Sequence, residues 1–210
     1  MIDLVAAFAA GYFVGALPFA YWLAKLRGHD IFAVGSGNMG AMNSARHVGK
    51  AVGVAVLLLD LAKGATAAVV GGWMAGQAGS DPLAATLAAG MGAVVGHAWS
   101  AYVRFRGGKA LATMLGAILV VSPWVGGYAL ATLIALLLLT RRAQLAAIVT
   151  LLLYPFLTVT VLLRHGWTQE HAFAVGTAAG LAAIVSLVKH LRSPSSPAGD
   201  DRPRPADPGP

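Results

Sequence analysis

Long apolar runs alternate with short polar segments along the chain as far as about residue 190. A bilayer core about 30 Å thick is crossed by about 20 residues of helix, so each long run predicts a membrane-spanning helix. The runs cover residues 4–24, 51–74, 82–101, 110–122, 124–140, 143–163 and 171–189. The pattern therefore predicts an all-α fold, a polytopic integral membrane protein with seven transmembrane helices.

The stretch 110–140 fits either one long helix kinked at Pro123 or two crossings on either side of it. The basic residues decide, because Lys and Arg collect in cytoplasmic loops. With two crossings, 13 of the 15 basic residues share one side. They are Lys25, Arg27, Arg46, Lys50, Arg104, Arg106, Lys109, Arg141, Arg142, Lys189, Arg192, Arg202 and Arg204. Segment 110–122 spans only about 20 Å as a helix, so we expect a short or re-entrant element there.

The same charge asymmetry predicts an external amino terminus and a cytoplasmic carboxyl end. No basic residue precedes the first run, which begins after Met1-Ile2-Asp3, so we interpret it as a retained helix rather than a cleaved signal peptide. Residues 193–210 are rich in Pro, Ser, Gly and Asp, a composition that predicts disorder. The expected organisation is a membrane domain over 1–192 followed by a disordered cytoplasmic tail over 193–210.

Composition narrows the function classes. With 58% hydrophobic and 11% charged residues, the chain is not an ordinary soluble domain. The absence of cysteine excludes disulfides, thiolate metal sites and a cysteine nucleophile. The net charge of +7 resides in short loops between apolar runs, so its expected counterparts are anionic lipid headgroups and phosphorylated substrates rather than nucleic acid.

The segment 35–46, GSGNMGAMNSAR, has the character of an anion site. Glycines at 35, 37 and 40 permit positive φ, so that successive backbone N–H groups can form a nest for an anion. The accompanying hydrogen-bonding side chains are Ser36, Asn38, Asn43 and Arg46. The glycine spacing also fits a dinucleotide loop, but an apolar helix precedes it instead of a strand. A flexible interfacial turn is the alternative interpretation.

A second candidate anion site is Gly107-Gly108-Lys109, which opens the fourth run. The glycines allow close backbone approach, and Lys109 precedes a helix whose amino-terminal dipole favours anions. We interpret Arg104 and Arg106 as interfacial anchors, whereas His97 fits a structural role and a functional role equally well.

Two further features carry ionisable groups. His190 emerges at the same predicted side as both candidate anion sites. Asp60 and Lys63 lie three residues apart inside the second run and share a helical face. Because the two charges can neutralise each other, we favour a structural pair, with a direct role in a site as the alternative.

With these segments described, the sequence resembles the bacterial glycerol-3-phosphate acyltransferases that use acyl-phosphate as donor, the PlsY family. The resemblance extends from the first helix to about His190 and is carried by LPF at 17–19, GSGNMGAMNSAR at 35–46, LLLDLAKG at 57–64 and GHAWSAYVRFRGGKALAT at 96–113. It implies a seven-helix enzyme of the bacterial cytoplasmic membrane, with its active site facing the cytoplasm.

The reaction that the resemblance implies is transfer of a fatty acyl group from acyl-phosphate to the 1-hydroxyl of glycerol 3-phosphate. The product is lysophosphatidic acid, an intermediate of phospholipid synthesis. No metal or cofactor is implied. Expected partners are the two substrates, membrane lipids and, as a candidate, the enzyme that produces the acyl-phosphate.

The resemblance also implies residue roles. It gives catalytic roles to Ser36, Arg46, Lys109 and His190. The expected substrate-binding residues are Gly35, Gly37, Asn38, Asn43, Gly107 and Gly108.

The sequence departs from the family pattern at four places. The family has threonine at the position of Met42, proline near Ser100, glycine at the position of Ala110 and asparagine at that of Ser193, followed by a glutamate that the tail lacks. These departures leave open a weakened paralogue or a scaffold of a lipid-synthesis complex. A transporter of anionic solutes is a further alternative, although we find neither an internal repeat nor polar external loops.

Overall fold

The structure, a computed structural model, describes residues 2–192. Within this range the regular elements are helices, and the prediction of an all-α fold is confirmed. The helices are α1 (Ile2–Gly15), α2 (Phe19–Leu26), α3 (Ala41–His47), α4 (Lys50–Ala78), α5 (Pro82–Ala98), the 3₁₀ turn η1 (Ala101–Val103), α6 (Leu111–Val121), α7 (Pro123–Thr140), α8 (Ala143–Arg164) and α9 (Gln169–Arg192).

Every predicted apolar run is helical, and five stretches are long and apolar enough to cross a membrane: residues 4–26, α4, α7, α8 and α9. The other two runs form the shorter helices α5, with 17 residues, and α6, with 11 residues. The chain is thus a multi-pass membrane protein, and seven full crossings stay a prediction.

The division at Pro123 is as predicted. Helix α6 ends at Val121, and α7 begins at Pro123, where the missing N–H of proline is tolerated at the first helical position. Ser122 caps α7, since its hydroxyl accepts a hydrogen bond from the backbone N–H of Val125 at 3.4 Å.

The first run differs from the prediction, because it is not one helix. Helix α1 ends at Gly15 and α2 begins at Phe19, with Ala16, Leu17 and Pro18 between them. A proline lacks the N–H that would continue the helix, and it biases the preceding residue away from the α conformation. The interruption separates α1 from the short helix that leads into the first polar segment.

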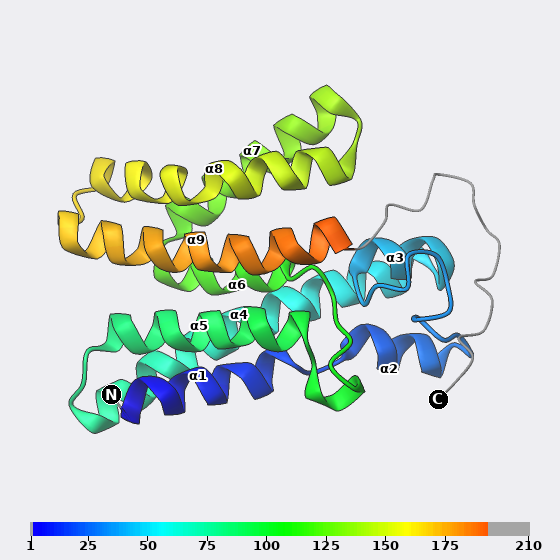
Figure 1. The fold of residues 1–210 in the computed structure, drawn as a ribbon, viewed down its shortest axis with the longest axis horizontal. Helices are drawn as coiled ribbons and strands as arrows, with labels where there is room; N and C mark the ends of the chain where they lie inside the picture. The colour runs from blue at the N-terminus through cyan, green and yellow to red at the C-terminus, as the bar shows by residue number, and fades with distance from the viewer. Residues whose placement is uncertain (1, 193–210) are drawn as a thin grey trace.

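The helices lie alongside one another, and successive long helices run in opposite directions (Figure 1). At one end gather the first polar loop (residues 27–40), α3, the second polar loop (residues 99–110), the α7–α8 turn and the carboxyl end of α9 (Figure 1). We call this the basic end. Together with the end of α2, which carries Lys25, and the start of α4, which carries Lys50, it contains all Lys and Arg residues of the described chain except Lys63, inside α4, and Arg164, at the opposite end.

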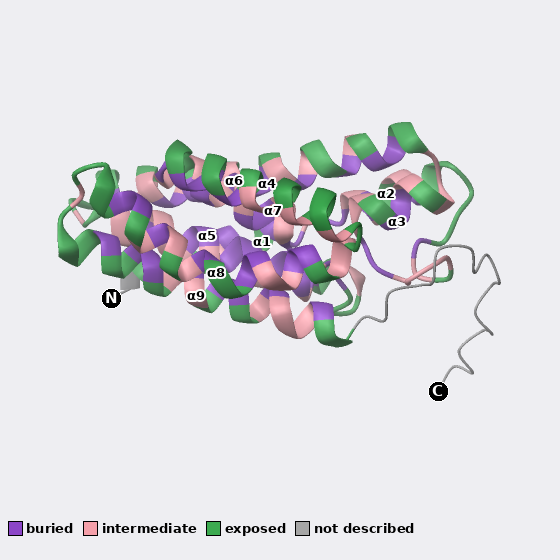
Figure 2. Cartoon of the chain, turned by 90° about the horizontal axis from the view of Figure 1, so that it is seen from above, coloured by how far each residue is buried: buried purple, intermediate pink, exposed green. Residues whose placement is uncertain are grey.

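Small residues allow the helices to pack backbone against backbone, as is typical in membranes. A Cβ atom added at Gly92 or Gly96 of α5 would overlap the α1 carbonyl oxygens of Phe8 and Tyr12. A Cβ atom added at Gly64 of α4 would likewise overlap the carbonyl oxygen of Thr113 in α6. The buried residues therefore lie mainly where helices face each other (Figure 2).

Two glycines of α4 provide a matched test of this packing. We expect Gly64→Ala to lower the midpoint of thermal unfolding in detergent, because overpacking a close helix contact costs about 1–3 kcal/mol. Gly76→Ala should leave the midpoint unchanged or raise it, since no atom lies within 4 Å of the added methyl group and alanine favours the helix. Equal effects of the two substitutions would contradict backbone packing as the cause.

Candidate active site

Asn43 organises the first polar loop. Its Nδ2 atom donates to the carbonyl oxygens of Ile31 at 3.3 Å, Val34 at 3.2 Å and Asn38 at 3.1 Å. Its Oδ1 atom accepts from the backbone N–H of Ser36 at 3.1 Å. One buried side chain thus replaces the regular backbone hydrogen bonds that the loop lacks. The amide is occupied by the protein, so its geometry suits a positioning role.

The two glycines around Ser36 meet the expectation of positive φ. Gly35 has φ +54° and Gly37 has φ +64°, in the left-handed region where residues with a Cβ atom are disfavoured. A Cβ atom at Gly35 would also overlap the ring of His47 and the side chain of Asn43. Both the conformation and the space at this position therefore require glycine.

Two polar side chains of this region, one in the loop and one on α3, have no partner of opposite character within residues 2–192. Asn38 is buried, and its Oδ1 atom has no hydrogen-bond partner among the described residues. Arg46, on α3, is exposed, and no carboxylate of the described chain lies within ion-pair distance of it. Buried amide oxygens normally find a donor. A cation and an acceptor are thus available to a ligand here.

The second polar loop lies against the first. A Cβ atom at Gly108 would overlap the imidazole of His97 and lie 2.7 Å from the carbonyl oxygen of Met39, in the first loop. At Gly107 it would overlap the carbonyl oxygens of His97 and Ala98. The Gly108 N–H donates to the His97 carbonyl oxygen at 3.0 Å. Because they lack a Cβ atom, these glycines allow the backbone of the second loop to lie close to His97 and to the first loop. The two candidate anion sites are therefore adjacent.

Lys109 is half-buried at the junction of the two loops. Burial lowers the pKa of its ammonium group below the ordinary lysine range, because desolvation disfavours the charged form. No carboxylate of the described chain pairs with it. Ser186 of α9 fixes its backbone, since the Ser186 hydroxyl donates to the Lys109 carbonyl oxygen.

His190 is buried near the end of α9, and its Nδ1 atom lies 2.9 Å from the carbonyl oxygen of Ser186. A carbonyl oxygen can only accept, so this hydrogen bond assigns the proton to Nδ1 and leaves Nε2 as the acceptor of the neutral ring. Ser186 therefore contacts both Lys109 and His190. The sequence interpretation missed this serine, whose only signal is its position four residues before His190 in an apolar run.

A cluster of ionisable groups lies beneath the loops. Lys63 Nζ is 2.8 Å from Asp60 Oδ1, which confirms the expected pair. His97 Nδ1 lies 3.5 Å from the same oxygen without the geometry of a hydrogen bond. Lys63 also donates to the carbonyl oxygen of Leu17 at 3.1 Å. The sequence did not decide between a structural and a functional role for His97, and the structure places it in this cluster.

Comparison with known proteins identifies the family. The chain matches the family model described as glycerol-3-phosphate acyltransferase over residues 5–195. A glycerol-3-phosphate acyltransferase of Anaeromyxobacter is 38% identical over 183 residues, 87% of this chain and 86% of that protein. One of Brucella suis is 40% identical over 189 residues, 89% of this chain and 86% of that protein. This chain belongs to the glycerol-3-phosphate acyltransferase family.

Solved structures of the glycerol-3-phosphate acyltransferase family support the fold. The crystal structure of PlsY, an integral membrane glycerol 3-phosphate acyltransferase, in its glycerol 3-phosphate form has a TM-score of 0.75 and 29% sequence identity, and the match covers 90% of this chain and 88% of that chain. The lysophosphatidic acid form has a TM-score of 0.70 and 25% identity, covering 90% and 98% of the two chains.

Two departures from the family pattern have a structural explanation. Ala110 has φ +62°, a left-handed conformation that costs a residue with a Cβ atom about 1–2 kcal/mol and explains a glycine in the family. The Ser100 hydroxyl donates to the carbonyl oxygen of Ala16, a bond that proline cannot form. Met42 is exposed on α3, and nothing in the structure explains its replacement of threonine. Ser193 lies outside the described residues.

The second polar loop carries two further basic side chains besides Lys109. Arg104 and Arg106 are both exposed, and the Arg106 guanidinium lies 5.1 Å from the ring centroid of Phe32. Arg106 thus contacts the first polar loop, and the interpretation of both arginines as interfacial anchors stays a prediction.

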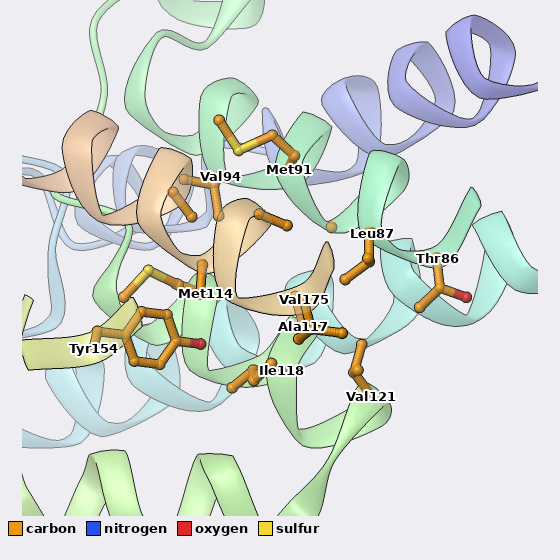
Figure 3. Close-up of a pocket in the computed structure, with 14 residues that line it drawn as sticks. Thr86, Leu87, Met91, Val94, Met114, Ala117, Ile118, Val121, Tyr154 and Val175 are labelled. Atoms are coloured by element: carbon orange, nitrogen blue, oxygen red, sulfur yellow. The ribbon is translucent and has the colours of Figure 1, made fainter. Parts of the chain in front are cut away.

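An apolar pocket lies between α5, α6, α8 and α9 (Figure 3). Val94 and Met114 line it on the side of the basic end, each within about one helical turn of the second polar loop. Thr86 and Tyr154 provide the hydroxyl groups in an otherwise apolar lining (Figure 3). The lining of the pocket is therefore predominantly apolar, and none of the candidate site residues belongs to it.

The hydrogen bonds of Asn43 generate a direct test. Asn43→Asp preserves size and the acceptor for the Ser36 N–H but removes the three donations to carbonyl oxygens. We expect it to destabilise the protein by about 1–3 kcal/mol, because buried acceptors lose their donor. Thermal unfolding measures this effect, with Asn43→Ser as a smaller side chain that can still donate. Full stability of Asn43→Asp would show that the loop does not depend on this amide.

Proposed function

We propose that this chain is an acyl-phosphate-dependent glycerol-3-phosphate 1-O-acyltransferase. It transfers a fatty acyl group from acyl-phosphate to the 1-hydroxyl of glycerol 3-phosphate and releases lysophosphatidic acid and phosphate. The observation that carries the proposal is the junction of two glycine-containing loops with Arg46 and Lys109, which have no carboxylate partner in the described chain. The glycerol 3-phosphate and lysophosphatidic acid forms of the solved relatives match the proposed acceptor and product.

The reaction requires cations because both substrates are phosphates. The glycerol oxygen attacks the acyl carbonyl carbon, a tetrahedral oxyanion forms, and the bond between that carbon and the phosphate oxygen breaks. Two anions must be held within reacting distance while negative charge develops. In this proposal Arg46 supplies a planar pair of donors, and Lys109 supplies a mobile ammonium group.

The loops divide the binding of the two substrates. The Gly35 N–H and the Ser36 hydroxyl hold phosphate oxygens, whereas the N–H groups of Ser36 and Gly37 donate to Asn43 Oδ1 and to the Val34 carbonyl oxygen and so hold the turn. Gly107 and Gly108 form the wall of the acceptor site. The unpartnered Oδ1 atom of Asn38 can accept a hydrogen bond from a glycerol hydroxyl, and its amide nitrogen can donate to phosphate. Asn43 shapes the first loop without contacting substrate.

His190 is the group that accepts the proton of the attacking hydroxyl. Its Nδ1–H is occupied by the Ser186 carbonyl oxygen, so the unprotonated Nε2 atom is available. The acyl group passes directly between the substrates, and no acyl-enzyme accumulates. The hydrocarbon chain of the donor lies along the apolar helices.

The proposed location is the bacterial cytoplasmic membrane, with the basic end and the site in the cytoplasm. The soluble acceptor then reaches the site from the cytoplasm, while the acyl-phosphate arrives from the membrane or from the enzyme that makes it. The alternatives are a weakened paralogue or a scaffold, which the changes at Met42 and Ala110 favour, and a transporter of anionic solutes.

Turnover tests this function and its donor. Purified protein with acyl-phosphate and glycerol 3-phosphate should release lysophosphatidic acid and phosphate. Arg46→Gln and Lys109→Met should each lower kcat/KM by about 10–100-fold, the loss expected for a charge-assisted hydrogen bond. Arg104→Gln is the matched control, because Arg104 is an exposed arginine of the same end, and its kcat/KM should change little.

Two outcomes would contradict parts of the proposal. Product formed with acyl-CoA but not with acyl-phosphate would exclude the donor. Failure with every acyl donor, in protein that is folded by thermal unfolding, would favour the scaffold alternative.

The orientation can be tested with single cysteines, since the chain contains none. Tyr102→Cys places a thiol at an exposed site of the basic end, and Gln169→Cys places one at an exposed site of the opposite end. In intact cells an impermeant thiol reagent should label the second variant and not the first, because the basic end is predicted to be cytoplasmic. The reverse labelling would overturn the proposed orientation.

A further inference from the structure

The proposed reaction makes no use of the buried cluster of Asp60, Lys63 and His97. Their relative exposures are 3%, 4% and 4%, inside a bundle of predominantly apolar helices. Ionised groups are costly inside a membrane protein, and an ion pair recovers that cost only in part. Asp60 and Lys63, both on α4, already neutralise each other, so a structural ion pair needs no third ionisable group. The presence of His97 therefore calls for a separate explanation.

The cluster contacts both segments that lead to the candidate site. Through Lys63 Nζ it binds the Leu17 carbonyl oxygen at 3.1 Å, in the break between α1 and α2, the helix that precedes the first polar loop. Through His97 it reaches the second loop, because the imidazole packs against Gly108 and the His97 carbonyl oxygen accepts the Gly108 N–H at 3.0 Å.

The two loops meet at Gly108. An added Cβ atom there would overlap His97 on one side and lie 2.7 Å from the Met39 carbonyl oxygen on the other, so the glycine is held between the imidazole and the first loop. A rotation of the imidazole would therefore displace Gly108 relative to the first loop. The ring lies beside Asp60, whose Oδ1 atom is 3.5 Å from Nδ1, so that the carboxylate and the imidazole are electrostatic neighbours.

We propose that Asp60, Lys63 and His97 form a positioning network. The network fixes the position of Gly108 relative to the first polar loop, and thereby shapes the phosphate site for the glycerol 3-phosphate acceptor. Asp60 orients His97, and Lys63 neutralises Asp60 while it fixes the chain at Leu17. None of the three touches substrate. This inference rests on the proposed function, because it assigns the acceptor to the wall formed by Gly107 and Gly108.

The test removes both charges at once. Asp60→Leu combined with Lys63→Met leaves no unpaired charge, and such replacements of buried ion pairs are often neutral for stability. We expect KM for glycerol 3-phosphate to rise about tenfold, the effect of a misplaced hydrogen-bonding contact, with KM for the acyl donor unchanged and kcat changed less. His97→Asn, which removes the ring beneath Gly108, should raise the same KM.

The control is Ser122→Ala, which removes a buried hydroxyl cap at the opposite end of the bundle. It should lower the unfolding temperature and leave both KM values unchanged. The network is excluded if the double variant and His97→Asn behave like this control, with altered stability and an unaltered KM for the acceptor.

Thermal stabilisation by added glycerol 3-phosphate separates this inference from the proposed function. If the wild type is inactive but is stabilised by this ligand, the proposed function fails, and weaker stabilisation of both variants still supports the network. If the ligand does not stabilise the wild type and no turnover occurs, both proposals fail. Turnover with an unchanged acceptor KM in both variants overturns the network alone.

Discussion

Carbonyl oxygens freed by the break between α1 and α2 need donors, because a lipid environment offers no water to satisfy them. The structure supplies these donors from other helices. Ala16 receives the hydroxyl of Ser100, and Leu17 receives the ammonium group of Lys63. A third bond joins the same elements, from the Tyr12 hydroxyl to the Trp99 carbonyl oxygen at 2.9 Å. These three bonds tie the broken helix to α4 and to the end of α5, where the second polar loop begins.

Hydrophobic runs and charge distribution predicted the helices and the basic end, since both follow from burial and lipid contact along the chain. The division at Pro123 was also predictable, because the number of crossings determines on which side the basic residues fall. The break at Pro18 was missed, since an average of hydropathy does not register one absent N–H group. Positive φ at Gly35 and Gly37 was predictable because it is a local property of glycine.

The rest of the site depends on contacts between residues far apart in the chain, which spacing does not encode. The role of Asn43 in folding the loop depends on carbonyl oxygens up to 12 residues away. The hydrogen bond from Ser186 to Lys109 spans 77 residues. Family resemblance named Lys109 and His190, but it gave no reason for the serine between them. The role of His97 stayed ambiguous because it depends on the contact of its ring with Gly108, which forms only in the folded chain.

Ser186 links two residues of the candidate site to the same position of α9. Its hydroxyl holds the backbone of Lys109, and its own carbonyl oxygen accepts from the imidazole of His190, so two residues of the candidate site are hydrogen-bonded to one residue of α9. Transmembrane helices change their tilt when bilayer thickness changes. A tilt of α9 would carry both groups along together and preserve their mutual distance. The two hydrogen bonds to Ser186 would therefore keep the Lys109 backbone and the His190 ring at a similar separation in bilayers of different thickness.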